Sequence, residues 1–268
     1  MTHKDSGLDF YHKDWLNLYS QLPDYQPAKL GDFELKNREI AKGTKLRGYD
    51  HHKGELFLLE YATPFSIAEL RQGEDIWMST TQLELEGLII PVRRAKGRVF
   101  TSGLGLGCFA WLAALKSSVS SVTVVEQSQE VIDLIMPQLM RADPKIAAKI
   151  RPICSPLEYH WANCEDKYEF IYLDIWGSLL GPLKDALKAK AAAEPFRAHR
   201  GEIRLWLQEL IDRVLKQLPK EAQPLSSLAT IQTPCLVCSK IFRFDFAGLC
   251  MDCADELELS NLYVKRGA

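Results

Sequence analysis

The stretch VFTSGLGLGCFAWLAAL, residues 99–115, passes from an apolar segment through three alternating glycines into a segment of helical composition. The glycines are Gly103, Gly105 and Gly107. Glycine adopts the backbone angles of a sharp turn without strain, and its missing side chain lets backbone N–H groups approach a ligand. The stretch therefore predicts a strand, a tight turn and a helix. The turn alone is compatible with a nucleotide-type ligand or with close packing.

The residues around this turn alternate between strand and helix patterns. Four apolar segments predict strands, and they are residues 97–102, 121–127, 149–155 and 168–176. Helical segments lie between the first three, at 108–118 and 128–140. Such alternation is typical of βαβ units on a parallel sheet. Residues 182–218 carry an apolar face at helical spacing, so we expect helix there, no strand after Trp176, and a short sheet of four parallel strands.

The N-terminal third predicts a strand-rich region that ends in a helix. Residues 33–40, 44–50 and 54–62 alternate or run apolar between glycine-containing breaks, as hairpin strands do. Residues 80–95 supply a helical apolar face, interrupted by Pro91. Thr81 and Glu84 have the spacing of a capping box at its start.

The C-terminus predicts a small metal-stabilised module. Four of the seven cysteines form two Cys-x-x-Cys pairs separated by eleven residues, and they are Cys235, Cys238, Cys250 and Cys253. This spacing is typical of a tetrahedral thiolate zinc site, in a treble-clef-like arrangement with a hairpin between the pairs and a helix after the second. A module of this length buries too little surface to fold without the metal, so a structural Zn2+ is expected.

These patterns divide the chain into four parts. We expect a strand-rich region at 1–95, a Rossmann-like α/β core with a helical C-terminal part at 96–218, a linker at 219–234 and the zinc module at 235–268. Acidic residues slightly outnumber basic ones in the module, which disfavours phosphate binding and favours a protein partner or self-association through it.

The amino-acid composition excludes several classes of protein. The 268 residues are 47% hydrophobic and 25% charged, as in an ordinary globular protein, and the formal net charge is -2. This balance disfavours nucleic acid as the main partner. The first residues have no apolar leader pattern, and the longest apolar run, residues 108–115, is too short to span a bilayer. A cytoplasmic protein without a membrane partner is expected.

Two acids point to the ligand of the glycine turn. Glu126 ends the second predicted strand, 21 residues after Gly105, where a carboxylate can accept both hydroxyls of a ribose. Asp174 lies at the carboxyl end of the fourth strand, toward the same edge of the sheet. The pattern Gly105-x-Gly107-x-x-Ala110 also fits a dinucleotide site, but no second mononucleotide half follows. S-adenosylmethionine is therefore favoured, and NAD is the weaker alternative.

Longer segments around these residues resemble a known family. They are residues 79–107, 122–134, 149–161 and 168–178. Together they resemble the class I S-adenosylmethionine-dependent methyltransferase fold, within it the spermidine synthase-like branch, and bacterial and phage-borne proteins with the same GLGLG and DIW sequences. The resemblance covers roughly residues 50–180 and implies a cofactor-binding set: Gly103, Gly105, Gly107, Glu126, Gln127, Ser155, Pro156 and Asp174. The glycines would line the methionine part of the cofactor, Glu126 would hold the ribose, the turn at 155–156 would flank the adenine, and Asp174 would face the reacting end.

The sequence also departs from that family. Thr101 stands where methyltransferases commonly have an acid, and Ser155 where spermidine synthases contact the adenine with an aspartate. Leu106 and Gly177 replace two further acids of the spermidine synthases. Because amine substrates need paired carboxylates, aminopropyl transfer is disfavoured.

The sequence favours a methyltransferase-like protein that binds S-adenosylmethionine, with an acceptor that the residues do not name. If the chain is an enzyme, Asp174 is the expected catalytic residue, because methyl transfer needs an aligned acceptor and the removal of a proton. The rival hypothesis is a non-catalytic adaptor that uses a degenerate form of this fold and the zinc module to bind a protein. A nicotinamide-dependent oxidoreductase is the weaker alternative.

Overall fold

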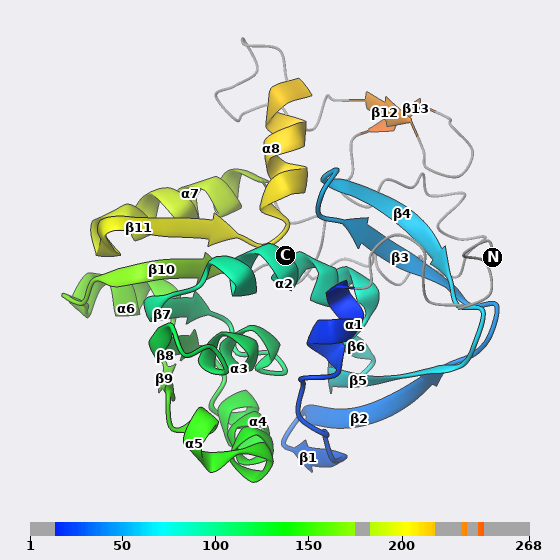
Figure 1. Cartoon of the computed structure of the whole chain (residues 1–268), viewed down its shortest axis with the longest axis horizontal. Coiled ribbons are helices and arrows are strands. Elements are labelled where there is room, and N and C mark those ends of the chain that lie inside the picture. Colours follow the sequence, from blue (N-terminus) through cyan, green and yellow to red (C-terminus); the bar gives the residue numbers. More distant parts are fainter. Residues whose placement is uncertain (1–13, 175–182, 218–231, 235–240, 244–268) are drawn as a thin grey trace.

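A five-stranded parallel sheet forms the centre of the molecule in this computed structural model, which describes residues 14–174, 183–217, 232–234 and 241–243 (Figure 1). The strands are β7 (Gly97–Ser102), β8 (Val119–Glu126), β9 (Ile150–Cys154), β10 (Tyr168–Leu173) and β11 (Arg197–Leu205). Their order in the sheet is β11-β10-β7-β8-β9, and every neighbouring pair is parallel. The predicted Rossmann-like α/β core is therefore present.

Helices connect these strands and cover both faces of the sheet. They are α3 (Cys108–Ala114), α4 (Gln129–Ala142), α5 (Pro144–Ala147), α6 (Leu157–Asn163), α7 (Leu183–Ala193) and the 3-10 helix η2 (Glu194–Phe196), and a further helix, α8 (Gln208–Gln217), follows the last strand. Helices α3 and α4 lie on one face, and α6 and α7 lie on the other (Figure 1). The start of α4 is fixed by its cap, because the Ser128 hydroxyl accepts a hydrogen bond from the Val131 N–H.

The fifth strand corrects the sequence analysis, which expected helix over residues 182–218 and a sheet of four strands. Residues 197–205 form β11, which pairs with β10 so that Ile203 lies beside Ile171 and Leu205 beside Leu173. Ile203 and Leu205 are buried, and the intervening Arg204 is partly exposed, which is the alternation of a strand. The predicted helix is confirmed only on either side of this strand, in α7 and α8.

The N-terminal region contains two antiparallel sheets, as the sequence predicted in outline. The larger one has the order β1 (Ala28–Leu30), β2 (Phe33–Ile40), β5 (Phe65–Gln72) and β6 (Asp75–Ser79). Strands β3 (Lys45–Asp50) and β4 (Glu55–Glu60) form a separate hairpin. A short helix, α1 (Asp14–Tyr19), precedes them. The three segments predicted as hairpin strands correspond to β2, β3 and β4.

Helix α2 (Gln82–Arg94) joins the two regions. It continues past Pro91 for three more residues, so the predicted interruption does not occur. Thr81 occupies the N-cap position, but its side chain makes no capping hydrogen bond and instead lies 3.1 Å from the Ser79 hydroxyl oxygen. The predicted capping box is therefore wrong, which leaves Glu84 to serve another purpose.

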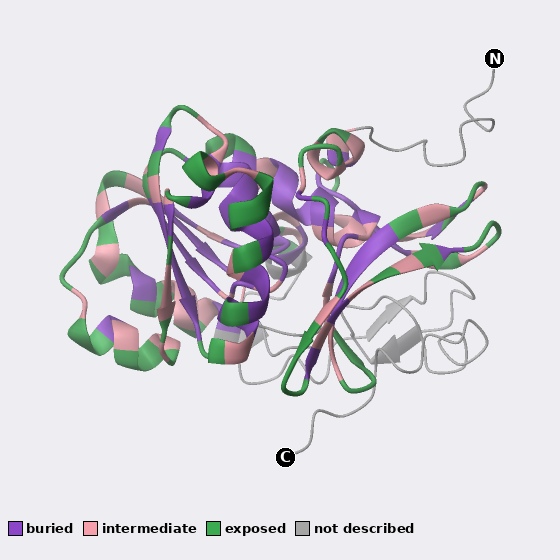
Figure 2. Ribbon diagram, turned by 90° about the horizontal axis from the view of Figure 1, so that it is seen from below, coloured by how far each residue is buried: buried purple, intermediate pink, exposed green. Residues whose placement is uncertain are grey.

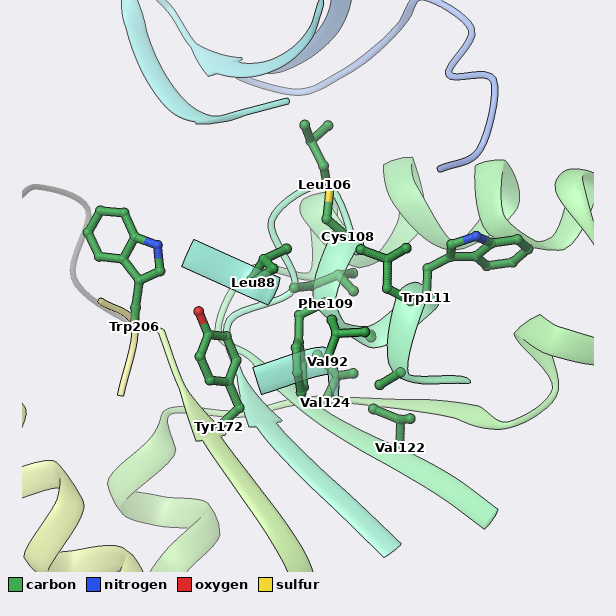
Figure 3. Close-up of a cluster of buried hydrophobic side chains, with 14 of the residues drawn as sticks. Leu88, Val92, Leu106, Cys108, Phe109, Trp111, Val122, Val124, Tyr172 and Trp206 are labelled. Carbon is green, nitrogen blue, oxygen red and sulfur yellow. The ribbon is translucent and has the colours of Figure 1, made fainter. Parts of the chain in front are cut away.

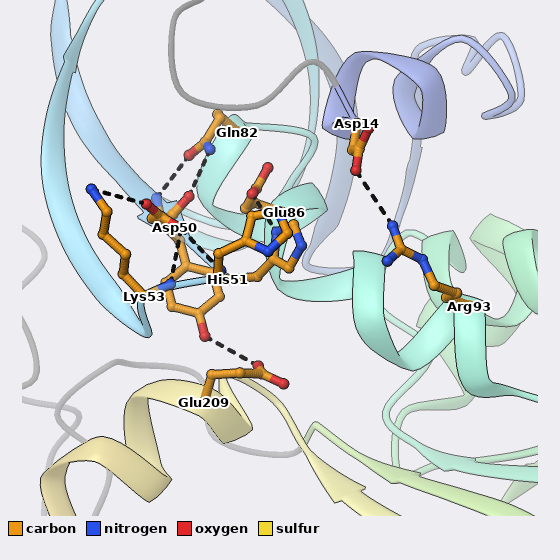
Figure 4. Close-up of polar contacts among 10 residues, drawn as sticks. Asp14, Asp50, His51, Lys53, Gln82, Glu86, Arg93 and Glu209 are labelled. Carbon is orange, nitrogen blue, oxygen red and sulfur yellow. Dashed lines mark hydrogen bonds and ion pairs between the residues drawn. The ribbon is translucent and has the colours of Figure 1, made fainter.

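The region between the N-terminal sheets and the core is packed on both sides of α2. Figure 2 shows buried residues running from the parallel sheet into the N-terminal sheets, and Figure 3 shows α2 and α3 side chains meeting Tyr172 and Val124 of the sheet. Polar contacts fix the β3–β4 hairpin to α2 (Figure 4): the Gln82 amide bonds both backbone groups of Tyr49, and His51 Nδ1 lies 2.6 Å from a buried Glu86 oxygen. One hydrophobic core thus spans the two regions, and this holds α2 in a fixed position against the sheet.

Near the C-terminus, β12 (Gln232–Pro234) pairs antiparallel with β13 (Ile241–Arg243). The sequence predicted a hairpin between the two cysteine pairs, whereas these strands flank the first pair in the sequence and β12 takes the last three residues of the predicted linker. Cys235, Cys238, Cys250 and Cys253 lie outside the described residues. Within the described ranges, no helix combines the length and apolar character that crossing a bilayer requires.

Candidate functional site

The candidate site lies where the direction of the sheet connections reverses. From β7 the chain proceeds outward through β8 and β9, and then returns to place β10 on the other side of β7. In open α/β sheets, ligands bind outside the carboxyl ends of the strands at such a switch point. Ser102 and Leu173 are paired at these ends, so the next residues, Gly103 and Asp174, are brought together. The sequence placed both residues at this edge, and the structure brings them into contact.

The three glycines of the turn all have positive φ, of 81° at Gly103, 51° at Gly105 and 75° at Gly107, but they face different neighbours. A Cβ on Gly103 would lie 2.6 Å from the backbone oxygen of Asp174. A Cβ on Gly105 would collide with the sulfur of Met78. Gly107 is the N-cap of α3, and a Cβ there would press on Leu139 of α4. The first two glycines therefore shape the open edge of the sheet, whereas Gly107 allows two helices to pack.

Glu126 ends β8 and lies against this turn. Its Oε2 accepts a hydrogen bond of 2.8 Å from the Leu104 N–H, and its Oε1 accepts one of 2.9 Å from the Ser128 N–H. The residue is buried, and the two backbone donors fix its carboxylate in one orientation. Since each carboxylate oxygen can accept more than one hydrogen bond, acceptor capacity remains for the hydroxyls of a ligand. The carboxylate is therefore held in place by the turn and by the start of the next helix.

The other predicted cofactor residues surround the end of β8 and β9. The Ser155 N–H donates to the Glu126 backbone oxygen at 3.0 Å, so the turn at 155–156 adjoins that acid. Ser155 is partly exposed, and Pro156 and Gln127 are exposed. These residues are therefore accessible from solvent at the same edge of the sheet.

Two residues that the sequence analysis did not identify hold the glycine turn from the N-terminal region. The Leu106 N–H donates to the sulfur of Met78 on β6 at 3.2 Å, and the hydroxyl of Tyr25 donates to the Leu106 backbone oxygen at 2.7 Å. Burial, followed by the neighbouring Cys108, raises the pKa of Tyr25 well above its ordinary value, so this hydroxyl keeps its proton. Nothing in the local sequence of either residue indicates this role.

Asp174, the acid that follows β10, interacts through its charge with Glu84 on α2. Tyr172 and Asp174 are two residues apart and so lie on the same side of the strand, the side on which the Phe109 ring of α3 packs 4.4 Å from the Tyr172 ring. Glu84, on α2, is affected by the charge of Asp174, which raises its pKa. Three residues further along α2, a Cβ on Gly87 would lie 2.9 Å from Trp206 Nε1, just after β11. Gly87 on α2 therefore lies against the residues that follow β11.

The carboxyl groups of Glu84 and Asp174 both have raised pKa values. Burial, followed by the charge of Asp174, raises the pKa of Glu84 from 4.5 to about 8, and burial raises the pKa of Asp174 from 3.8 to about 7. Burial also raises the pKa of the nearby Cys108 thiol to about 12, so it is no nucleophile at neutral pH. Glu84 and Asp174 nevertheless remain partly exposed, so a ligand can reach them. A carboxylate with a pKa near neutrality is suited to accept a proton from a substrate.

Three buried polar atoms lie at this edge. The Ser102 hydroxyl, the Tyr172 hydroxyl and Trp206 Nε1 are buried, and none has a hydrogen-bond partner among the described residues. Figure 3 shows the side chain of Tyr172 on β10 and that of Trp206, which follows β11. Buried donors without partners are costly in a folded protein and are often completed by a ligand.

The described part of the chain contains no cluster of metal-ligating side chains. No three His, Cys, Asp or Glu side chains gather there in a way that could hold a metal ion. The four cysteines predicted to bind zinc fall outside that part of the chain, as does Trp176, the last residue of the DIW sequence.

Comparisons with known proteins were made with both sequence and structure. No family model and no curated protein matches the sequence. Solved structures do match, among them a Streptococcus mutans protein assigned as a SAM-dependent methyltransferase, with 13% identity, 69% of this chain and 49% of that chain covered, and a TM-score of 0.43. Precorrin-6y C5,15-methyltransferase from Geobacter metallireducens matches with 13% identity, coverage of 47% and 63%, and a TM-score of 0.36.

A third match is the O-methyltransferase TomG from Streptomyces achromogenes in complex with SAM, with 9% identity, coverage of 50% and 67%, and a TM-score of 0.37. The chain spans about half the length of the first structures it matches, with 52%, 49% and 47% of them covered. With TM-scores below 0.5, these likenesses establish neither an activity nor a substrate for this chain.

Proposed function

We propose that this chain binds S-adenosylmethionine at the carboxyl ends of β7 and β8 and transfers its methyl group to an acceptor held near Asp174. The observation that carries the proposal is the hydrogen bond of 2.8 Å between the Leu104 N–H and Glu126 Oε2, which joins the acid of β8 to the glycine turn. This pair lies at the switch point of a five-stranded parallel sheet.

The residues at this edge fit the parts of an adenosyl ligand. The fixed carboxylate of Glu126 would accept hydrogen bonds from the ribose hydroxyls, and the turn at 155–156 would flank the base. Gly103 would leave the backbone at the start of the turn open to the remainder of the molecule, whereas Met78 covers Gly105. When bound, the cofactor supplies an electrophilic methyl group on a sulfonium sulfur.

Asp174 would receive the proton that the acceptor loses. Its carboxyl group follows β10, beside the glycine turn, and remains partly exposed. Because burial raises its pKa to about 7, it can take a proton at neutral pH and release it again to water.

Calorimetric titration tests the cofactor. We expect S-adenosylmethionine and its demethylated product to bind, decarboxylated S-adenosylmethionine to bind less well, and NAD not to bind. Glu126→Gln leaves one acceptor oxygen instead of two and should weaken the binding of the demethylated product at least tenfold. Glu165→Gln, at an exposed position before β10, is the matched control and should bind as the wild type does.

The same titration separates the alternatives. Because Glu126 also bonds Leu104 and Ser128, circular dichroism must first show that the Glu126→Gln protein is folded. Tight binding of NAD alone would favour an oxidoreductase. Binding of none of the four compounds would contradict the proposal and favour the non-catalytic adaptor.

We also propose that Cys235, Cys238, Cys250 and Cys253 hold one structural Zn2+ ion. Their spacing supports this, and so does the pairing of β12 with β13 on either side of the first cysteine pair in the sequence. Metal analysis of the protein purified under reducing conditions should give one zinc per chain, and Cys250→Ser should lose it. A zinc content near zero in the wild type would contradict this proposal.

The partner of the C-terminal module is part of the same proposal. If the module binds a second copy, light scattering should show a larger species that the removal of zinc by a chelator dissociates. If the protein is a monomer both with and without the metal, self-association is excluded and the proposed partner is a different protein.

A further inference from the structure

We propose that Met78 is a gate on the glycine turn. In the free protein its side chain closes the turn at Gly105 and Leu106, and it moves away when the cofactor binds. The proposal rests on the proposed function for the identity of the ligand, but the closed contact is described by its own distances. Met78 belongs to β6, so the gate comes from the N-terminal region and not from the parallel sheet.

The first argument is that a single sulfur atom closes the middle of the turn. The Met78 sulfur lies so close to Gly105 that a Cβ there would collide with it. The same sulfur accepts a hydrogen bond of 3.2 Å from the Leu106 N–H. At Gly103 the nearest atom is instead a backbone oxygen, that of Asp174. The start of the turn is thus bounded by fixed backbone, whereas its middle is covered by one side chain.

The second argument is that the turn does not need Met78 to keep its shape. The Leu104 N–H donates to the Glu126 carboxylate at 2.8 Å, and the Tyr25 hydroxyl donates to the Leu106 oxygen at 2.7 Å. A thioether sulfur is a weak acceptor, whereas hydrogen bonds to a carboxylate are among the strongest in proteins. The bond to Met78 is therefore the weakest of the three. The other two come from separate parts of the chain and persist when Met78 leaves.

The third argument is that Met78 is free to move. It is partly exposed, whereas Leu70, its register partner on β5, is fully buried. Strand β6 is the end strand of the four-stranded sheet, and its pairing with β5 is irregular just beyond Leu70. Methionine is unbranched and has three rotatable side-chain bonds. Opening the gate therefore needs only side-chain rotation, and the sheet can stay in place.

The strength of the closing contact sets the size of the effect. A contact of about one weak hydrogen bond leaves roughly one molecule in five open. The apparent affinity for a ligand that needs the open form is reduced by that fraction. Removal of the gate should therefore strengthen binding about fivefold. The alternative is that Met78 is a permanent packing contact between the two regions, in which case its removal gives no such gain.

Calorimetry with the demethylated cofactor tests the gate on the full chain. We expect Met78→Ala to bind it about fivefold more tightly than the wild type. Met140→Ala, at a methionine of α4 that is 45% exposed, is the matched control and should bind as the wild type does. Circular dichroism must first show that both variants are folded. Unchanged affinity in Met78→Ala would overturn the proposal, and so would weaker affinity, which would make Met78 part of the bound site.

Hydrogen exchange followed by NMR tests the wild type without a variant or a ligand. Leu104 and Leu106 are both buried, but only the Leu106 N–H depends on Met78. We expect the Leu106 amide to exchange at least tenfold faster than the Leu104 amide, relative to their intrinsic rates, because the gate opens while the bond to Glu126 persists. Equal protection of the two amides would overturn the proposal.

The two experiments also separate this proposal from the proposed function. If neither the wild type nor Met78→Ala binds the demethylated cofactor, the proposed function fails, and the exchange of the Leu106 amide still decides whether the gate opens. If both proteins bind it equally well and the two amides are equally protected, the gate fails and the proposed function stands.

Discussion

The two halves of the candidate site differ in how completely their polar groups are satisfied. At the glycine turn, Glu126, Met78 and Tyr25 each bond a backbone group of the turn, and they come from three separate parts of the chain. Around Asp174, the Tyr172 hydroxyl and Trp206 Nε1 are equally buried but have no partner among the described residues.

This difference indicates a division of labour. Groups that are bonded before a ligand arrives hold a rigid shape, and that is what selective binding of a large cofactor requires. Groups left without partners are destabilising in the free protein and become favourable only when a ligand completes them. Under the proposed function, the glycine turn would be the positioning half, and the edge around Asp174 would be the half that receives the reacting group.

Gly103→Ala should have the largest effect, because it disturbs the contact between the two halves. The residue has a φ of 81°, and its Cβ would lie 2.6 Å from the Asp174 backbone oxygen. The backbone strain of alanine at this φ and the displacement of the Asp174 backbone should together lower the free energy of unfolding by about 3 kcal/mol. Urea unfolding followed by circular dichroism measures this.

Gly43→Ala is the matched control for that measurement. Gly43 has a φ of 84°, but a Cβ there would meet nothing within 4 Å. Only the backbone strain remains, so we expect a loss of about 1 kcal/mol. Equal losses at Gly43 and Gly103 would show that the close approach to Asp174 contributes nothing.

The raised pKa values predict a second, pH-dependent effect. Between its ordinary pKa of 4.5 and about 8, Glu84 holds a proton in the folded chain that the unfolded chain has released. The unfolded state thus binds fewer protons in this window, and the free energy of unfolding falls as pH rises. Asp174 acts in the same direction between 3.8 and about 7.

Glu84→Gln removes the larger of these two contributions. Its stability relative to the wild type should therefore rise by about 1 to 2 kcal/mol across the window, with the partial exposure of the group allowed for. Urea unfolding at pH values on both sides of the window measures the rise. The groups around Glu84 that could share the effect are Asp174, Tyr172 and Cys108, and a constant difference at all pH values would mean that Glu84 has an ordinary pKa.

The contrast between the halves also explains what the sequence could predict. Glu126 was found because a strand, a turn, a helix and the next strand have nearly fixed lengths, so the acid that ends β8 must return to the glycine turn. Asp174 was found for the same reason, at the end of β10. Both predictions depend only on the local order of the elements.

The residues that the sequence analysis missed depend on packing between distant elements. Glu84 fits a capping box by spacing, but Thr81 makes no capping hydrogen bond, and the charge of the distant Asp174 raises the pKa of Glu84. Tyr25 reaches the turn across a separation of 81 residues. The strand β11 was read as helix because Ile203 stands four residues before Leu207, a spacing that also continues the helical face of α8.

Tyr25→Phe tests the positioning half on a smaller scale. The change removes one buried hydrogen bond, from the hydroxyl to the Leu106 oxygen, and little volume. We expect the free energy of unfolding to fall by about 1 kcal/mol and the affinity for the demethylated cofactor to fall severalfold. Tyr159→Phe, at a position that is 67% exposed, should change neither quantity. No loss in Tyr25→Phe would mean that the turn keeps its shape without this contact.

Tyr172→Phe is the corresponding change in the receiving half, and we expect the smallest effect on stability. Its hydroxyl is as buried as that of Tyr25 but has no partner in the described part of the chain, so its removal deletes a desolvated group and no bond. The free energy of unfolding should stay the same or rise by up to about 1 kcal/mol. A variant that loses about as much stability as Tyr25→Phe would show that the Tyr172 hydroxyl is bonded in the free protein, and the contrast between the two halves would then disappear.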